Sequence, residues 1–423
     1  MTGSVTDSTG PVGLVLSGGG ARGAYEFGAL SALVPVLEER GERPRIIVGT
    51  SAGALNAAYL GAGADRGLVS VVDAGCQLWG ELKFGDVLGP LMSARALRAG
   101  LRFGLEFAGF PVASAQSLLD NTPLADTINA RISFATLAEN VRSGVIQAAA
   151  VAATSYDTGR SVVFCDSPAA PQRDDTRAID YAATRLAAVH VRASTAMEAL
   201  FPAVNVTEPA GVAGWYGDGG TSLNTPLKPA LALGAERLIV IGLNSTASNS
   251  PAAAVHPADA FDGAAQAVQA LFADQLVNDV ATLATTNQIT AARHGGARDA
   301  RTPGGRRVIP YIFVAPRERF VVGRLASTIY RQRYTGLSGL RRAGNLALLG
   351  RLLGAHRNPA RGELFSYMFF APEFAEALMA QGRRDAEWWL AQQHDDGHGA
   401  WASCLDHITS GPDLAATTLP SRT

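Results

Sequence analysis

The sequence predicts an α/β protein with a mostly parallel central sheet, and three observations near its start carry that prediction. Residues 13–17 and 45–49 are short apolar segments with the length and composition of buried strands. Each segment runs directly into a glycine-rich turn. Each turn is followed by a helical pattern, which ends at Gly41 in the first unit and covers residues 52–63 in the second. Parallel sheets are built from strand–turn–helix units that repeat in this way.

The first helical pattern carries a conflicting signal. Apolar residues recur at helical spacing, and Gly41 is a stop signal. Pro35 lies inside this pattern, so we expect either a kinked helix or a shorter one. The recurring residues are Leu30, Leu33, Val34 and Leu37.

The rest of the chain continues the α/β pattern and then becomes mostly helical. We expect strands at residues 145–153, 161–165, 237–243 and 307–316, a polar loop at 166–178, and helices within 85–135, 226–236 and 257–292. There is no internal repeat and no proline-rich linker. We therefore expect a disordered N-terminus at residues 1–11, an α/β domain at 12–320 and a helical C-terminal extension at 321–423 packed on it.

Composition narrows the functional classes. The chain has 423 residues, is 47% hydrophobic and has a formal net charge of −1, so no global positive field favours nucleic acid. Its cysteines, Cys76, Cys165 and Cys404, are too few and too far apart for a disulfide framework or a zinc site. We find no secretory signal pattern and no apolar stretch of the roughly 18 residues that a membrane-spanning helix needs. These observations predict a cytoplasmic protein.

Charge is unevenly distributed along the chain. Residues 293–361 contain fifteen arginines and two acidic residues, whereas residues 362–423 contain nine acidic residues and three arginines. In one interpretation, the arginines form an exposed surface that holds the protein at an anionic membrane. In the other, they pair with the acidic residues elsewhere in the chain.

An amphipathic helix is also expected within residues 92–110. One face carries Arg95, Arg98 and Arg102, and another carries Leu97, Leu101 and Leu105. It would lie either near the mouth of the site or on the surface, packed on the core.

The first glycine-rich turn has two interpretations. Gly18, Gly20 and Gly23 match the G-x-G-x-x-G pattern of dinucleotide-binding proteins. That interpretation requires an acidic residue at the end of the second strand, and here the second strand runs into Gly49 and Ser51 instead. What remains is a turn whose backbone N–H groups, at the start of a helix, can bind a phosphate or a developing oxyanion.

Ser51 is the candidate nucleophile. It lies between Gly49 and Gly53, after a strand and before a helix, where the N–H of Ala52 would face negative charge on the substrate. Of the seven histidines, only His190 has a context that suggests a base. Asp218, which precedes two glycines and a helix start, is the better candidate, although an ordinary Asp-Gly turn would look the same.

Three motifs in one order resemble the patatin-like phospholipase family. They are Gly18-Gly19-Gly20-Ala21-Arg22-Gly23, then Gly49-Thr50-Ser51-Ala52-Gly53, then Asp218-Gly219-Gly220. The segments 117–132, 192–204, 219–227 and 233–243 are also similar to parts of the family, and 363–386 is similar to a C-terminal segment of some bacterial members, so the resemblance covers about residues 12–390. Met197 and Ala203 depart from it at positions where proline is common, which affects the shape of the substrate pocket.

The resemblance implies a three-layer α/β/α fold and an enzyme that cleaves acyl esters of lipids without a metal or cofactor. Ser51 would be the nucleophile and Asp218 its base, with Gly18, Gly19, Gly20 and Ala52 supplying the oxyanion hole and Arg22 beside it; Gly49, Gly53, Gly219 and Gly220 would support the two turns. Acyl transfer to another acceptor, a thioesterase, or a lipid-binding protein with an unused site are the alternatives. The expected partner is a lipid ester, with peripheral binding to an anionic membrane and no nucleic acid; the oligomeric state stays open.

Overall fold

A computed structural model describes residues 10–91, 119–198, 200–245, 279–292, 307–355, 359–392 and 400–403. The helix expected within residues 92–110 lies outside the described residues, as does part of the arginine-rich segment. The strands are β1 (Val12–Leu16), β2 (Pro44–Thr50), β3 (Ala148–Ser155), β4 (Ser161–Asp166), β5 (Ile179–Ala183), β6 (Val204–Val206), β7 (Gly214–Asp218), β8 (Arg237–Ile241) and β9 (Tyr311–Val314).

Helices account for most of the other described residues. Those of the α/β part are α1 (Ala24–Glu39), α2 (Ala52–Gly63), α3 (Leu68–Glu81), α4 (Phe84–Val87), α6 (Thr122–Arg131), α7 (Phe134–Arg142), α8 (Ala188–Ser194), α9 (Gly220–Leu223) and α10 (Leu227–Ala232). The C-terminal helices are α12 (Val321–Arg333), α13 (Gly336–Leu352), α14 (Pro359–Ser366) and α15 (Pro372–Ala391). Short 3-10 turns are η1 (Gly20–Gly23), η2 (Ala64–Arg66) and η3 (Ala210–Val212). No described helix is long and apolar enough to cross a membrane.

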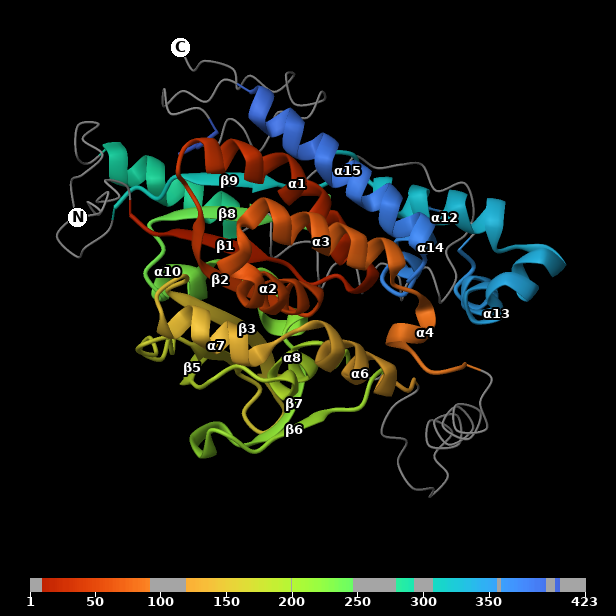
Figure 1. Ribbon diagram of the computed structural model, residues 1–423, viewed down its shortest axis with the longest axis horizontal. Coiled ribbons are helices and arrows are strands. Elements are labelled where there is room, and N and C mark those ends of the chain that lie inside the picture. Colours follow the sequence, from red (N-terminus) through yellow and green to blue (C-terminus); the bar gives the residue numbers. More distant parts are fainter. Residues whose placement is uncertain are drawn as a thin grey trace, which may run out of the picture.

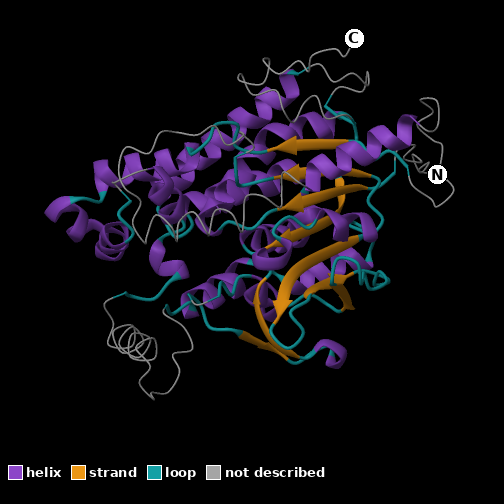
Figure 2. Cartoon of the chain, turned by 180° about the vertical axis from the view of Figure 1, so that it is seen from behind, coloured by secondary structure: helices purple, strands orange, loops and turns teal. Residues whose placement is uncertain are grey.

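The described strands form one mostly parallel sheet with helices packed around it, which confirms the predicted fold class (Figures 1 and 2). Its main path is β5-β4-β3-β2-β1-β8-β9. Five strand pairs are parallel, and β3 pairs antiparallel with both β4 and β7. The central strands β1, β2 and β8 are almost wholly buried, as expected of a parallel sheet covered on both faces.

The first strand–helix unit forms where the sequence predicts it. Helix α1 runs without interruption through Pro35, so the shorter-helix alternative is wrong. Proline in a helix costs about 3 kcal/mol, and the buried apolar face of α1 outweighs that cost. The helix ends as expected, because Gly41 has a left-handed φ of 69° and its N–H donates to the Glu38 carbonyl.

Three strands of the structure, β5, β6 and β7, were not predicted from the sequence. β5 follows the polar loop, and β6 and β7 form an antiparallel pair at the edge that β3 provides. The strand β7 has the sequence GWYGD, whose glycines and aspartate are typical of a turn. Tertiary pairing with β3 overrides that local preference.

The C-terminal helices pack on the first part of the chain. In Figure 1, α15 lies alongside α1, although more than 300 residues separate them in the sequence. Glycines permit the close contact: a Cβ on Gly28 would lie 2.1 Å from the Met379 carbonyl oxygen, and one on Gly382 would lie 2.2 Å from that of Tyr25. The boundary proposed at residue 320 stays a prediction.

Candidate active site

Ser51 occupies a sharp turn between β2 and α2. Its φ of 53° and ψ of −120° lie in a region that residues with a side chain rarely adopt, at a typical cost of about 1–3 kcal/mol. The turn places Ser51 at the N-cap of α2, at the carboxyl end of the strand. This is the geometry of a nucleophile elbow, in which the serine hydroxyl stands clear of the backbone.

The register of the sheet brings Asp218 to Ser51. Thr50 at the end of β2 pairs with Ala152 in β3, and the next β3 residue, Ala153, pairs with Asp218 at the end of β7. The Ser51 hydroxyl donates a hydrogen bond of 2.7 Å from Oγ to Asp218 Oδ2. The two sequence-predicted residues are therefore in direct contact, 167 positions apart in the chain.

Burial makes the Asp218 carboxylate unusually basic. The residue is 3% exposed, and loss of hydration raises the pKa of Asp218 to about 7. Hydrogen bonds from Ser51 and from the Gly220 N–H, the latter 2.7 Å from Oδ1, oppose this shift. The neighbouring carboxylate of Glu198 adds to it. Such a group takes up a proton near neutral pH, as a general base must.

A second serine, which the sequence analysis did not select, supports the elbow. The Ser51 N–H donates to Ser194 Oγ at 2.9 Å, and the Ser194 hydroxyl donates in turn to the Ala152 carbonyl. Ser194 is fully buried in α8. Its only sequence signal was its place in the segment 192–204 that resembles the family.

The glycine-rich turn after β1 lies over Ser51. An ideal Cβ on Gly18 would be 3.1 Å from Ser51 Cβ, and the Gly18 N–H donates to the Asn224 carbonyl at 3.2 Å. The predicted oxyanion donor Gly18 is thus already bonded within the fold. The N–H groups of Gly19, Gly20 and Ala52 are bonded to no other described residue, because they precede or open the first turns of η1 and α2.

Arg22 does not present its side chain to this turn. Its guanidinium is 2% exposed and bonded to the C-terminal part of the chain, including an ion pair with Glu363 at 2.6 Å. Arg22 lies in the glycine-rich turn, and its guanidinium is bonded to residues that lie far along the chain. Its place beside an oxyanion hole stays a prediction.

His190 is a structural residue. It is 3% exposed, its Nδ1 accepts from the Ala187 N–H at 3.0 Å, and its Nε2 lies 3.3 Å from the Glu208 carbonyl oxygen. Its ring packs on Phe164 with centroids 4.6 Å apart. Burial lowers the pKa of His190. The other six histidines lie outside the described residues.

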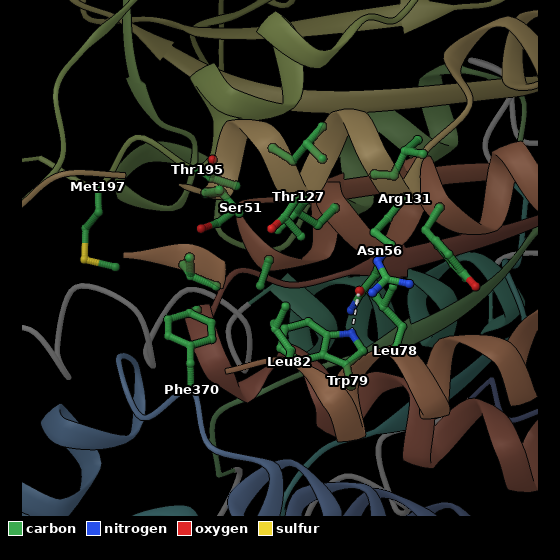
Figure 3. Close-up of a pocket in the computed structure, with 18 of the residues that line it drawn as sticks. Ser51, Asn56, Leu78, Trp79, Leu82, Thr127, Arg131, Thr195, Met197 and Phe370 are labelled. Carbon is green, nitrogen blue, oxygen red and sulfur yellow. Dashed lines mark hydrogen bonds between the residues drawn. The ribbon is translucent and has the colours of Figure 1, made fainter. Parts of the chain in front are cut away.

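An apolar pocket opens beside Ser51 (Figure 3). In this view, Met197 and Phe370 lie on one side of Ser51, while Leu78 and Arg131 lie on the other. Met197, one of the two departures from the family pattern, thus forms part of the pocket wall. The lining residues are mainly aliphatic and aromatic, namely Leu55, Tyr59, Leu78, Trp79, Leu82, Val87, Leu124, Ile128, Ile132, Met197, Phe201, Tyr367, Met368 and Phe370.

Few polar groups interrupt this wall. Asn56 is held in place by Trp79, whose indole N–H donates to Asn56 Oδ1 at 3.0 Å, and by Glu26, whose Oε2 accepts from Asn56 Nδ2 at 2.7 Å. Glu26 is fully buried, and loss of hydration raises its pKa well above the usual range. No cluster of His, Cys, Asp and Glu within the described ranges could hold a metal ion.

The sequence model of one family, described as patatin-like phospholipase, matches residues 14–231 of this chain. The chain belongs to the patatin-like phospholipase family. No curated protein matches it. Among solved structures, the crystal structure of VipD from Legionella pneumophila matches with a TM-score of 0.30 and 15% sequence identity, over 73% of this chain and 61% of that one.

Proposed function

We propose that the protein is a lipid acyl hydrolase that cleaves carboxylic esters through a Ser51–Asp218 dyad. One observation carries the proposal: the 2.7 Å hydrogen bond from Ser51 Oγ to Asp218 Oδ2, at the edge of a pocket lined mainly by apolar side chains. Asp218 accepts the hydroxyl proton while Ser51 Oγ attacks the ester carbonyl. The N–H groups of Gly19, Gly20 and Ala52 stabilise the resulting oxyanion. This assignment retains Gly19, Gly20 and Ala52 of the predicted donors and leaves Gly18 as their support.

The second half of the reaction uses the same groups. The proton on Asp218 passes to the departing alcohol, leaving the acyl group bonded to Ser51 Oγ. Asp218 then accepts a proton from a water molecule, which attacks the acyl carbonyl and releases the fatty acid. The apolar pocket suits an acyl chain, since each buried methylene contributes about 0.8 kcal/mol to binding.

Labelling with a fluorophosphonate tests this proposal. We expect covalent modification of Ser51 in the native protein and turnover of a short-chain aryl ester. Ser51→Ala should lose both, with activity at least about 10³-fold lower and melting behaviour unchanged. Absence of labelling in the folded native protein would favour a lipid-binding protein with an unused site.

We further propose that part of the arginine-rich segment binds anionic membranes. Some of its arginines are paired internally, as in Arg333 with Glu373 and Arg324 with Glu318. Arg341 and Arg342 on α13 are exposed and lie within 4.0 Å of no carboxylate among the described residues, although the charge of Arg342 also acts on Glu373. They adjoin Leu337 and Leu340, which are 78% and 40% exposed.

The position of α13 supports this assignment. Asn345 Oδ1 of α13 accepts from the Leu91 N–H at 3.1 Å, and Leu91 closely follows the pocket-lining Val87. A kink at Ala343 separates Asn345 from Arg341 and Arg342, which precede it by four and three residues. A bilayer bound by these arginines would thus lie near the segment that leads to the pocket. Arginines near an anionic bilayer each contribute about 1 kcal/mol, and the leucines add apolar contact.

A further inference from the structure

Every nitrogen of the Arg22 guanidinium bonds a residue far along the chain: two of them bond helix α14, and the third bonds Asn244 after β8. Nε donates to Ser366 Oγ at 2.8 Å, and Nη1 donates to Asn244 Oδ1 at 3.0 Å. Nη2 donates to both the carboxylate and the carbonyl oxygen of Glu363, each at 2.6 Å. The guanidinium also lies 3.9 Å from the centroid of the Tyr367 ring. A planar cation with this many fixed partners can occupy only one position.

Glu363 is itself fixed from a second direction. Its other carboxylate oxygen, Oε1, accepts a 2.7 Å hydrogen bond from the Gly323 N–H in the first turn of α12. A carboxylate at a helix N-terminus is stabilised by the helix dipole. Glu363 therefore joins α12, α14 and the turn after β1 through one buried group.

The segment that follows Glu363 also touches the turn directly. The Ala21 N–H donates to the Tyr367 carbonyl at 2.9 Å. Gly20 has a φ of 58°, and a Cβ there would lie 2.2 Å from the same carbonyl oxygen. Met368 and Phe370, just beyond, line the pocket beside Ser51. Glu363, Tyr367, Met368 and Phe370 lie outside residues 14–231, the stretch that the family model matches.

We infer that Glu363 is a positioning residue which, through Arg22, holds the Gly18–Gly20 turn where its N–H groups can bind the oxyanion. The inference rests on the proposed ester hydrolysis. Oxyanion donors act only at hydrogen-bonding distance from the reacting oxygen, and a displacement of about 1 Å can lower the rate about 100-fold. The turn is rich in glycine and so has little stiffness of its own. Its placement therefore depends on what it is bonded to.

A pair of replacements separates positioning from simple stabilisation. Glu363→Gln leaves the Arg22 charge buried without its partner and should lower both stability and kcat. The double variant Arg22→Met, Glu363→Met removes both charges and keeps the packing volume, so stability should largely return. We expect its kcat on a short-chain aryl ester to stay about 100-fold below wild type, with KM unchanged. A double variant with wild-type kcat would overturn the inference.

Two further variants keep the result decisive. Ser366→Ala removes the partner of Arg22 Nε and the 2.6 Å hydrogen bond from Ser366 Oγ to the Glu363 carbonyl, and it should stay folded with a severalfold lower kcat. Full activity there would count against the inference even if the double variant fails to fold. Asp385→Asn is the matched control, because Asp385 also bonds the C-terminal part to α1, through Tyr25 Oη at 2.8 Å, without contacting the turn. It should lower the melting temperature and leave kcat intact; an equal loss of kcat in this control would reduce Glu363 to a general stabiliser. A wild-type protein that neither reacts with fluorophosphonate nor turns over ester would instead refute the proposed hydrolysis.

Discussion

Gly49 and Gly53 approach each other so closely across Ser51 that a Cβ on Gly49 would lie 2.0 Å from the Gly53 carbonyl oxygen. A Cβ on Gly53 would in turn lie 2.4 Å from the Leu16 carbonyl oxygen of β1. Both contacts are with backbone, which cannot move aside without displacing the strand or the helix. The two glycines thus let α2 start directly against the sheet, which holds Ser51 at the strand end.

Replacing Gly53 by alanine should therefore damage the elbow severely. We expect Gly53→Ala to destabilise the protein by about 3 kcal/mol or more and to remove fluorophosphonate labelling. Thermal unfolding and labelling measure the two effects. Gly80→Ala in α3 is the control, because its Cβ would have 3.9 Å of clearance and should be tolerated or slightly stabilising. Gly53→Ala with wild-type labelling would disprove the steric account.

The activity should depend on pH through Asp218. Only the ionised carboxylate can accept the Ser51 proton, and its pKa is raised to about 7. Below that pH, kcat/KM should fall about tenfold per pH unit, and above it should level off. A profile that stays flat down to pH 5 would contradict a base with this pKa.

Two controls distinguish a fall of kcat/KM at acidic pH caused by Asp218 from one caused by a histidine. His190→Gln should leave it in place, since His190 has its own partners and none of them is Ser51 or Asp218. Carboxylates ionise with little heat, whereas imidazoles release protons more readily on warming. The fall should therefore hold its position as temperature rises; movement to lower pH on warming would point to one of the six histidines outside the described residues.

Asp218→Asn should abolish turnover and yet stabilise the fold at alkaline pH. The pKa of Asp218 is higher in the folded protein than the roughly 3.9 of an unfolded chain, so the folded state binds more protons between about pH 4 and 7. Wild-type stability should fall as pH rises through that window. Urea unfolding at pH 8 should show the variant more stable by about 4 kcal/mol at most, and the difference should shrink by pH 4. An equal difference in unfolding free energy between the variant and the wild type at pH 8 and pH 4 would contradict a raised pKa of Asp218.

Chain-length preference should respond to the pocket wall. Leu78→Trp replaces an aliphatic side chain by a larger indole ring on the α3 side of the pocket, away from Met197 and Phe370 (Figure 3). We expect kcat/KM for a long acyl ester to fall by at least about tenfold, with a butyryl ester little affected. Val69→Trp, on the same helix but outside the pocket, serves as the control. Equal losses on both esters would place the acyl chain elsewhere.

Membrane binding should depend on the arginines of α13. Arg341→Gln with Arg342→Gln should weaken sedimentation with anionic vesicles about 30-fold, at roughly 1 kcal/mol per arginine, and added salt should weaken the wild type similarly. Arg43→Gln with Arg66→Gln removes two exposed charges elsewhere and should have a small effect. Equal binding to neutral and anionic vesicles would show that these arginines do not direct attachment.

The local features of this site could be predicted from the sequence, and the long-range contacts could not. Glycine-flanked Ser51 and the turn after β1 are local patterns, each set by a strand, a turn and a helix start, so they were predictable. The position of Asp218 at the end of a strand could not be predicted. The segment GWYGD has turn-like composition and becomes a strand only by pairing with β3. The partners of Arg22 lie more than 200 residues away, where spacing and periodicity carry no information.

The contact of α1 with α15 bears on when the protein becomes active during synthesis. Helix α1 follows the first strand, yet its partner extends to residue 391. The turn after β1 cannot meet Glu363 and Tyr367 until α14 and the residue after it have been synthesised. If Glu363 positions the turn as inferred, a nascent chain that lacks α14 would hydrolyse ester poorly, and premature termination anywhere before α14 would yield a product without that support. Contacts between such distant parts of a chain also form slowly, so newly made protein would gain activity only after a delay.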